Sequence, residues 1–228
     1  MRNYIIYLPQ INASKETANN LYNRLTEYKQ NVKLYEGTFG PDAIRRQKEE
    51  NRTLHPWGVK GPPESRKHIN LNADEVKESP GVMGCFYSHY DLWKLCFDLK
   101  KPIAIWEDDI VLHRNYIPIK WDDILILALG HPKKSPRYMH YLDASKGTPA
   151  AQDYYQSSMP GCCGYAIKPH AAKKLLDTYE KTYLPADNAI NQYHVKIQIH
   201  SHCMGLALTK DDGKISLTRN NYWKNNGK

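Results

Sequence analysis

The sequence predicts an α/β fold in which a central, mostly parallel sheet is flanked by helices. Residues 4–8 form a short apolar run, and the helical spacing of apolar and aromatic residues in 18–28 predicts a helix after it. Residues 32–35 have the composition of a second strand. A strand, a helix and a strand in this order are typical of a parallel sheet. Residues 103–106, IAIW, indicate a central strand that is covered on both faces.

The composition is that of an ordinary folded domain with an excess of positive charge. The 228 residues include 32 Lys and Arg against 24 Asp and Glu, a formal charge of +8, and 41% of them are hydrophobic. These values exclude collagen-like, low-complexity and wholly disordered chains. The longest apolar run, 124–129, is too short to cross a bilayer, and Pro9 ends the first run before a signal-peptide core forms. We therefore expect a single, unprocessed cytoplasmic domain over 1–228.

The segment 37–80 is expected to be a long loop. Mixed charges and frequent Pro and Gly residues interrupt any regular period there, and a connection of this length is usually functional. We expect an insertion that closes over a bound ligand as a lid. Order returns at Gly84, where aromatic residues at three-to-four spacing predict a helix that ends near Lys100.

The second half of the chain predicts further strands and one more helix. The expected elements are the strands 138–142, 165–167 and 195–199 and the helix 171–179. A polar loop is expected up to Gln156, and the alternation in 195–199 indicates a half-exposed strand. The last segment, 218–228, is basic and rich in Asn, so we expect a basic tail.

The cysteines favour reduced thiols over a disulfide framework. Their number, five, is odd, and no export signal precedes them. A zinc site can be drawn from three cysteines and two histidines, namely Cys162, Cys163, His200, His202 and Cys203. No paired CxxC motif accompanies them, so small buried residues near turns are the favoured interpretation.

Three carboxylates follow the apolar run 103–106 without a break. Glu107, Asp108 and Asp109 would stand at the carboxyl end of a buried strand, where open α/β sheets bind ligands. Their charges are costly there unless a cation neutralises them. Such a cluster can hold a hard divalent cation, which would neutralise a diphosphate leaving group. The alternative is a solvated acidic turn.

The residues around this cluster resemble glycosyltransferase family 25, the lipooligosaccharide and procollagen galactosyltransferase family. The first matching block is Gly84 to His89 with Leu92 and Trp93, followed by 103–112, IAIWEDDIVL. The second comprises 161–167, GCCGYAI, and 185–187, PAD. The resemblance extends in order over about residues 1–205.

The resemblance implies a GT-A-like nucleotide-sugar-binding fold and an inverting transfer to a hydroxyl group. It also implies a nucleotide-sugar donor, for which a UDP-sugar is the first candidate. A divalent metal, Mn²⁺ or Mg²⁺, is implied as well. Asp109 would be the main metal ligand, and Glu107 or Asp108 would orient the nucleotide or complete the metal site. Tyr165 is expected near the nucleotide, and His200 or His202 could supply a further metal ligand.

Two residues of the matching blocks are expected to act in catalysis. Asp187 is the candidate general base, because an inverting transfer needs a carboxylate to accept the proton of the acceptor hydroxyl. The alternative for Asp187 is a helix N-cap before 188–193. For His89, a core histidine that orients the acidic loop is favoured over direct catalysis.

Two acceptors are nearly equal expectations. The resemblance favours a lipooligosaccharide at the inner face of the membrane, where the tail with Tyr222 and Trp223 would contact anionic lipid. The positive charge suits DNA equally well, with a hydroxymethylated base as acceptor, as in phage enzymes, which would place the protein in a host cytoplasm. The basic residues proposed for phosphate contacts are Arg45, Arg46, Lys48, Arg52, Lys60, Arg66 and Lys67. A protein of another class, a catalytically silent sugar- or nucleic-acid-binding domain, is the remaining alternative.

Overall fold

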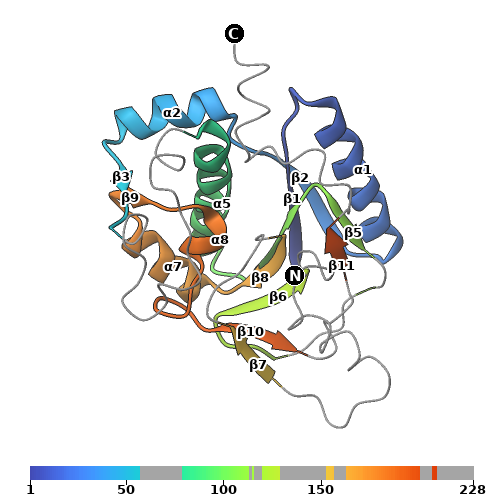
Figure 1. Ribbon diagram of the computed structural model, residues 1–228. Coiled ribbons are helices and arrows are strands. Elements are labelled where there is room, and N and C mark those ends of the chain that lie inside the picture. Colours follow the sequence, from blue (N-terminus) through green and yellow to red (C-terminus); the bar gives the residue numbers. More distant parts are fainter. Residues whose placement is uncertain are drawn as a thin grey trace, which may run out of the picture.

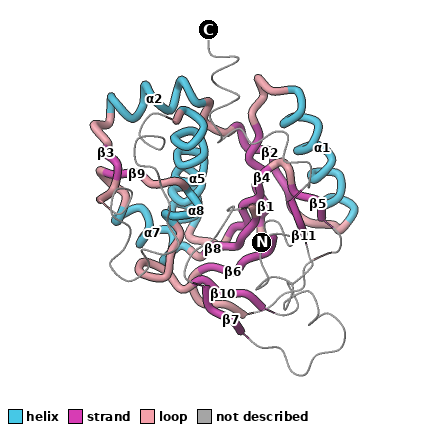
Figure 2. The backbone as a smooth tube through the Cα atoms, viewed as in Figure 1, coloured by secondary structure: helices cyan, strands magenta, loops and turns pink. Residues whose placement is uncertain are grey.

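The centre of the fold is a seven-stranded sheet with the strand order β2-β1-β4-β8-β6-β10-β7. The computed structural model describes residues 1–56, 79–112, 115, 120–128, 153–156, 163–200 and 207–209, and Figure 1 shows their arrangement. Helix α1 lies on one side of the sheet, and α2, α5 and α7 lie on the other (Figure 2).

The elements alternate between strands and helices along most of the chain. The first half contains β1 Arg2–Tyr7, α1 Asn12–Glu27, β2 Asn31–Glu36, α2 Gly40–Glu49, β3 Thr53–Leu54, α5 Pro80–Leu99 and β4 Ile103–Glu107. The second half contains β5 Ile110–Leu112, β6 Ile124–Ala128, β7 Asp153–Gln156, β8 Gly164–Ile167, α7 Pro169–Thr178, β9 Thr182–Tyr183, α8 Ala186–Ala189, β10 Ile197–His200 and β11 Ala207–Thr209.

Most strands of the sheet run in one direction. β1 is parallel to both β2 and β4, and β10 is parallel to β6. β8 runs antiparallel between β4 and β6, and β7 runs antiparallel to β10. Five of the seven strands therefore share a direction, which confirms the mostly parallel α/β sheet that the sequence predicts.

Successive residues of β4 are buried against opposite halves of the core. Ile103 and Ile105 belong to the cluster beneath α5 and α7, whereas Ala104 and Trp106 belong to the cluster beneath α1. Side chains of a strand alternate between the two faces, so a strand covered on both faces must be apolar throughout. All four side chains are almost completely buried, which confirms the prediction of a central, doubly covered strand.

Helix α5 brings the matching block Gly84 to His89 against the sheet. Ser79 caps its first turn by accepting a hydrogen bond from the Val82 amide at 3.4 Å, and Lys100 ends it in a left-handed conformation with φ 52°. At Gly84 a Cβ atom would lie 2.6 Å from the carbonyl oxygen of Thr38. Glycine therefore allows α5 to approach the connection between β2 and α2 at this point.

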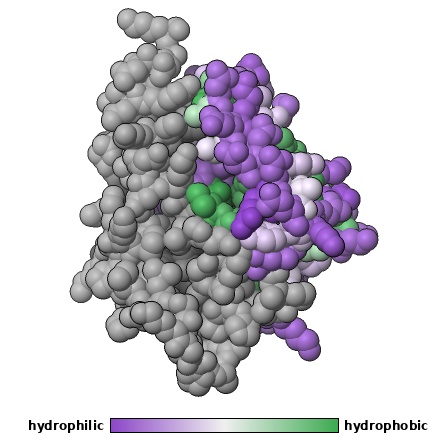
Figure 3. Space-filling model, turned by 90° about the vertical axis from the view of Figure 1, so that its right-hand side faces the viewer, coloured by the Kyte–Doolittle hydropathy of each residue, from purple (hydrophilic) through white to green (hydrophobic). Residues whose placement is uncertain are grey.

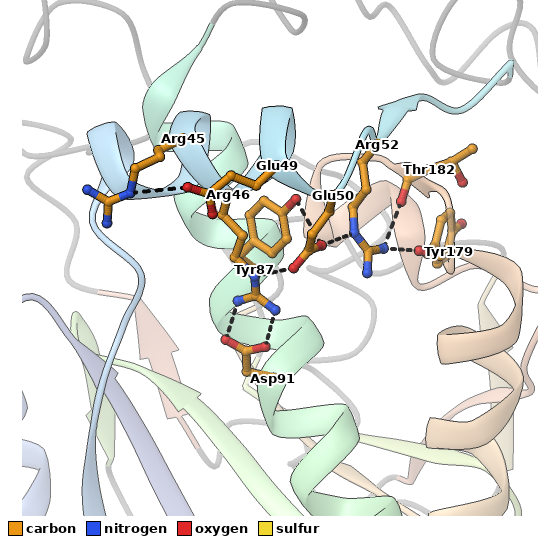
Figure 4. Close-up of polar contacts among 9 residues, drawn as sticks. All are labelled: Arg45, Arg46, Glu49, Glu50, Arg52, Tyr87, Asp91, Tyr179 and Thr182. Carbon is orange, nitrogen blue, oxygen red and sulfur yellow. Dashed lines mark hydrogen bonds and ion pairs between the residues drawn. The ribbon is translucent and has the colours of Figure 1, made fainter.

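The prediction of a loop is wrong for the first part of 37–80, where helix α2 and strand β3 form. Pro41 stands at the start of α2, where proline is tolerated, and Gly40 and Ala43 are buried. Arg46 joins the helix to α5 through two hydrogen bonds to Asp91, at 2.7 and 2.8 Å (Figure 4). Tertiary ion pairs therefore stabilise a helix whose sequence is too polar to predict one. The remainder of the expected lid, 57–78, lies outside the described residues.

Strand predictions in the second half are partly confirmed. β8 and α7 form where strand and helix were expected, but the polar loop up to Gln156 contains β7, and residues 124–128 of the longest apolar run form the central strand β6. The half-exposed strand is wrong in its environment, because Ile197 and Gln198 are both buried. β10 pairs with β6 on one side and β7 on the other, which covers it. The expected strand 138–142 and the basic tail 218–228 lie outside the described residues.

The described surface is predominantly polar. Figure 3 shows hydrophilic residues over most of the described part of one face, with a small apolar area beside the residues drawn in grey. Among the helices that the structure describes, none is long and apolar enough to span a membrane.

Candidate active site

Four carboxylates from two separate parts of the chain gather at the carboxyl end of β4. Glu107 is the last residue of β4, Asp108 and Asp109 form the turn to β5, and Asp187 lies in the first turn of α8. A hydrogen bond of 2.8 Å from the Glu107 amide to the carbonyl oxygen of Cys163 fixes the backbone at this point. The sheet thus presents its acids at the edge where α/β folds bind ligands.

Burial and neighbouring acids raise the pKa of Glu107 and of Asp108. Burial raises the pKa of Glu107 well above its usual range, and the charges of Asp109, Asp108 and Asp187 raise it further. Burial also raises the pKa of Asp108 to about 6, against a hydrogen bond from Ser14 that lowers it. The site therefore concentrates negative charge, and a bound cation would relieve the repulsion.

Ser14 connects the acidic turn to the first strand and helix. Its hydroxyl accepts a hydrogen bond of 2.8 Å from the Leu8 amide and also bonds the Asp108 carboxylate, while the side chain is buried. Sequence reasoning missed this residue. Its position in the first turn of the helix after β1, at the carboxyl edge of a parallel sheet, is the signal that would have indicated it.

A buried chain of polar groups lies behind Glu107. The Trp93 indole donates to the Tyr165 hydroxyl at 2.8 Å, and this hydroxyl lies 2.8 Å from Nδ1 of His89. Nε2 of His89 lies 3.7 Å from Oε1 of Glu107. Burial lowers the pKa of His89 to about 3, so the imidazole is neutral. His89 thus contacts Glu107 from the interior, as expected of a histidine that orients the acidic loop.

Tyr165 offers no exposed surface to a nucleotide. The side chain is completely buried, its ring stacks on His89 with centroids 5.7 Å apart, and its hydroxyl contacts Trp93 and His89. The buried side chain of Tyr165 therefore has no surface with which to contact a nucleotide directly, and the expectation that it lies near the nucleotide stays a prediction. The tyrosine belongs to the packing behind Glu107, because the alternation of β8 directs it toward α5.

Asp187 is in the helix and does not cap it. The N-cap of α8 is Pro185, and the Asp187 carboxylate accepts a hydrogen bond of 3.3 Å from the Asn188 side chain. The N-cap alternative is therefore wrong. Asp187 also raises the pKa of Cys85 and Glu107, which places its charge beside α5 and β4.

The described residues do not place the histidines expected to complete the metal site, His200 and His202, beside the acids. His200 ends β10, which is separated from β4 by β8 and β6, and its side chain lies outside the described atoms. His202, like Cys162 and Cys203 of the alternative zinc site, lies outside the described residues. A different group of possible ligands does converge: Cys85, His89 and Glu107 have ligand atoms within 4.8 Å of one another.

The mixed sheet with an acidic strand end is consistent with a GT-A-like nucleotide-sugar-binding fold. The family model for glycosyltransferase family 25 (LPS biosynthesis protein) matches residues 42–190, and the chain therefore belongs to this family. The "Lipooligosaccharide biosynthesis protein lic2B" of Haemophilus influenzae is 30% identical over 138 residues. The aligned region is 59% of this chain and 46% of lic2B, so the chain spans about half the length of the curated relative it matches.

Proposed function

We propose that the protein transfers a sugar from a nucleotide-sugar donor to a hydroxyl group of a lipooligosaccharide-type glycan. The first candidate for the donor is a UDP-sugar. The observation that carries the proposal is the convergence of Glu107, Asp108, Asp109 and Asp187 at one edge of the sheet, in a chain that belongs to glycosyltransferase family 25. The similarity to lic2B, a lipooligosaccharide biosynthesis protein, supports the choice of glycan.

The residues at the site fit a hard divalent cation such as Mn²⁺ or Mg²⁺. These ions prefer carboxylate oxygens, and the pKa of Glu107 is raised first by burial and then by the neighbouring carboxylates, whose repulsion a cation would offset. Asp109 and Glu107 would hold the ion, and Asp108 would orient the nucleotide. When bound, the ion would supply neutralisation of the charge that develops on the diphosphate.

Asp187 is proposed as the general base. The acceptor oxygen would form its bond to the anomeric carbon while the bond from this carbon to the diphosphate breaks, and the carboxylate would take the proton of the acceptor hydroxyl. Attack from the face opposite the leaving group inverts the configuration. Asp187 suits this role because it comes from α8, outside the turn that carries the other three acids. His89 would hold Glu107 in place from the interior.

The fold removes part of the support for a DNA acceptor. Arg46 bonds Asp91 and Glu50, and Arg52 is buried and bonds Glu50 and the Tyr179 carbonyl (Figure 4). Arg45 is paired with Asp42 on the helix surface. Two of the arginines proposed for phosphate contacts, Arg46 and Arg52, are therefore engaged within the protein, and this favours the glycan as acceptor.

An acceptor screen tests the proposal. The chain is incubated with a panel of nucleotide sugars and Mn²⁺, with truncated lipooligosaccharide in one arm and hydroxymethylcytosine-containing DNA in the other, and products are identified by mass spectrometry. A hexose or pentose added to the glycan is expected. Modified DNA would overturn the choice of acceptor, and donor binding without any transfer or hydrolysis would support the silent binding domain instead.

A further inference from the structure

We propose that Cys85, His89 and Glu107 form a second metal site, selective for a soft divalent cation of the zinc class, on the interior side of the acidic turn. The site differs from the carboxylate site in two of its three ligands. It follows from contacts of this chain and does not require the transferase activity.

The geometry of the three residues is close to that of a zinc tripod. Cys85 and His89 are four residues apart on α5, which places both on one face of the helix, and Glu107 ends the neighbouring strand β4. Oε1 of Glu107 lies 3.9 Å from Sγ of Cys85 and 3.7 Å from Nε2 of His89. Ligand atoms around a tetrahedral zinc ion are about 3.3–3.6 Å apart, so the two distances to Glu107 would shorten by a few tenths of an ångström. The ligand atoms of Cys85 and His89 lie within 4.8 Å of each other, and rotation of the Cys85 side chain would close this remaining side of the site.

The donor types select zinc over the ion proposed for transfer. A thiolate and an imidazole favour zinc, whereas Mn²⁺ and Mg²⁺ favour oxygen ligands. The thiol of Cys85 would lose its proton to solvent as the sulfur binds the ion. The acidic turn and the tripod would thus bind ions of different chemistry with one shared residue, Glu107.

The surroundings of His89 are those of a metal-binding histidine. Histidine ligands commonly bond a protein group through the nitrogen that does not bind the ion, and this contact fixes the ring. Here Nδ1 lies 2.8 Å from the Tyr165 hydroxyl, which is itself bonded by the Trp93 indole. The ring is thereby held with Nε2 toward Glu107 and within reach of Cys85.

Two of the three residues of the site are partly exposed. His89 is 1% exposed, whereas the Glu107 side chain is 26% exposed and Cys85 is partly exposed. Ions and a water molecule would therefore enter past Glu107 and Cys85, and the water would take the fourth position that a three-ligand zinc site leaves open.

One consequence rests on the proposed function. If Glu107 belongs to the donor site, zinc bound by Cys85, His89 and Glu107 would make the Glu107 carboxylate unavailable to the metal of the donor site. Zinc is then expected to inhibit transfer at Mn²⁺ concentrations that otherwise support it, and the protein would respond to the ratio of the two metals.

Cobalt spectroscopy and zinc titration test the site without any sugar substrate. Co²⁺ added to the reduced chain is expected to produce a thiolate-to-cobalt charge-transfer band that zinc abolishes. Cys85→Ser should remove the band and weaken zinc binding at least tenfold, and His89→Gln should weaken it similarly. Cys96→Ser is the matched control, because Cys96 is a buried thiol of the same helix whose sulfur contacts backbone carbonyls. A band that survives Cys85→Ser would overturn the proposal.

X-ray absorption of the zinc-loaded, unmodified chain provides a measurement that does not depend on how the variants fold. One sulfur ligand together with nitrogen and oxygen ligands is expected. Two or more sulfurs would assign the ion to other cysteines, and none would assign it to the carboxylates; either result contradicts the tripod. Loss of zinc binding by Cys85→Ser with no transfer in the acceptor screen would refute only the proposed function, whereas transfer without a cysteine-bound zinc would refute only this inference.

Discussion

Two groups of charged residues in this protein change the pKa of a partly exposed carboxylate in opposite directions. The ion-pair group consists of Arg46, Glu50, Arg52 and Asp91, and the acidic group consists of Glu107, Asp108, Asp109 and Asp187. Glu50, between α2 and β3, has a side chain that is 33% exposed, and the side chain of Glu107 is 26% exposed. Burial alone would raise the pKa of both. Hydrogen bonds from Arg46 and Arg52 nevertheless lower the pKa of Glu50, whereas neighbouring acids raise that of Glu107 further. Cationic neighbours reverse the effect of burial on the pKa of Glu50, whereas at Glu107 burial and acidic neighbours act in the same direction, and this contrast distinguishes a structural carboxylate from a candidate catalytic one.

The ion-pair group serves to connect elements. Arg46 joins α2 to α5 through Asp91 and lies over the ring of Tyr87 at 4.3 Å, and Arg52 reaches the Tyr179 carbonyl after α7 (Figure 4). Every charge has an opposite charge close by, so the group is compatible with stability. The acidic group is costly for folding in the absence of a cation, which is a common property of functional sites.

The largest effect is expected from removing the proposed base. Asp187→Ala should lower the transfer rate about 10²–10⁴-fold, because the acceptor hydroxyl loses its proton acceptor. Binding of the nucleotide diphosphate, measured by calorimetry, should remain nearly unchanged. Asp177→Ala is the control, because Asp177 is an exposed acid at the end of α7 that pairs with Lys173. This variant should keep the transfer rate of the unmodified chain. Normal transfer by Asp187→Ala would assign the residue a structural role.

Added Mn²⁺ should stabilise the folded chain through the acidic group and not through the ion-pair group. Mn²⁺ at 100 times its dissociation constant is expected to raise the free energy of unfolding by about 2.7 kcal/mol, since only the folded chain assembles the site. Thermal unfolding with and without a chelator measures the change. Asp109→Asn should abolish the stabilisation, and Asp98→Asn, an exposed acid of α5, should retain it. An equal response of both variants would contradict the metal assignment.

Breaking the ion-pair group should lower stability by a smaller amount. Arg46→Met removes the bonds to Asp91 and Glu50 and should lower the free energy of unfolding by about 1–2 kcal/mol, because charged hydrogen bonds are lost at a partly exposed position. Arg45→Met is the control: its pairs are exposed, so a change below about 0.5 kcal/mol is expected. Urea unfolding compares the two. Equal losses would contradict the distinction between α2–α5 contacts and surface pairs.

The pH dependence should show the smallest effect. The pKa of Asp108 is raised from 3.8 to about 6 in the folded chain, so the folded state binds protons more tightly than the unfolded state between these values. The metal-free protein should therefore lose stability as the pH rises through about 6, by roughly 1 kcal/mol after solvent screening. Asp108→Asn should flatten this part of the profile, measured by urea unfolding in chelator. A profile identical to that of the unmodified chain would argue against the shift.

The sequence predicted most of the sheet because the signals were local. The apolar run before Glu107 and the periodic aromatic residues of α5 define their elements without reference to distant residues. Helix α2 was not predicted, because contacts with Asp91 on another helix stabilise it. β7 was not predicted, because its pairing with β10 in the sheet stabilises it. In both places tertiary contacts override local propensity.

The amino-acid order was enough to place three carboxylates directly after a buried strand, and its motifs indicated the family to which the chain belongs. The groups that surround those acids became known from the folded structure. It brings Asp187, Ser14, Cys85 and His89 to the strand end and engages Arg46 and Arg52 elsewhere. The reason is physical: the order of apolar residues fixes local structure, whereas the pKa of a carboxylate depends on charges and hydrogen bonds within a few ångströms, whatever their separation along the chain.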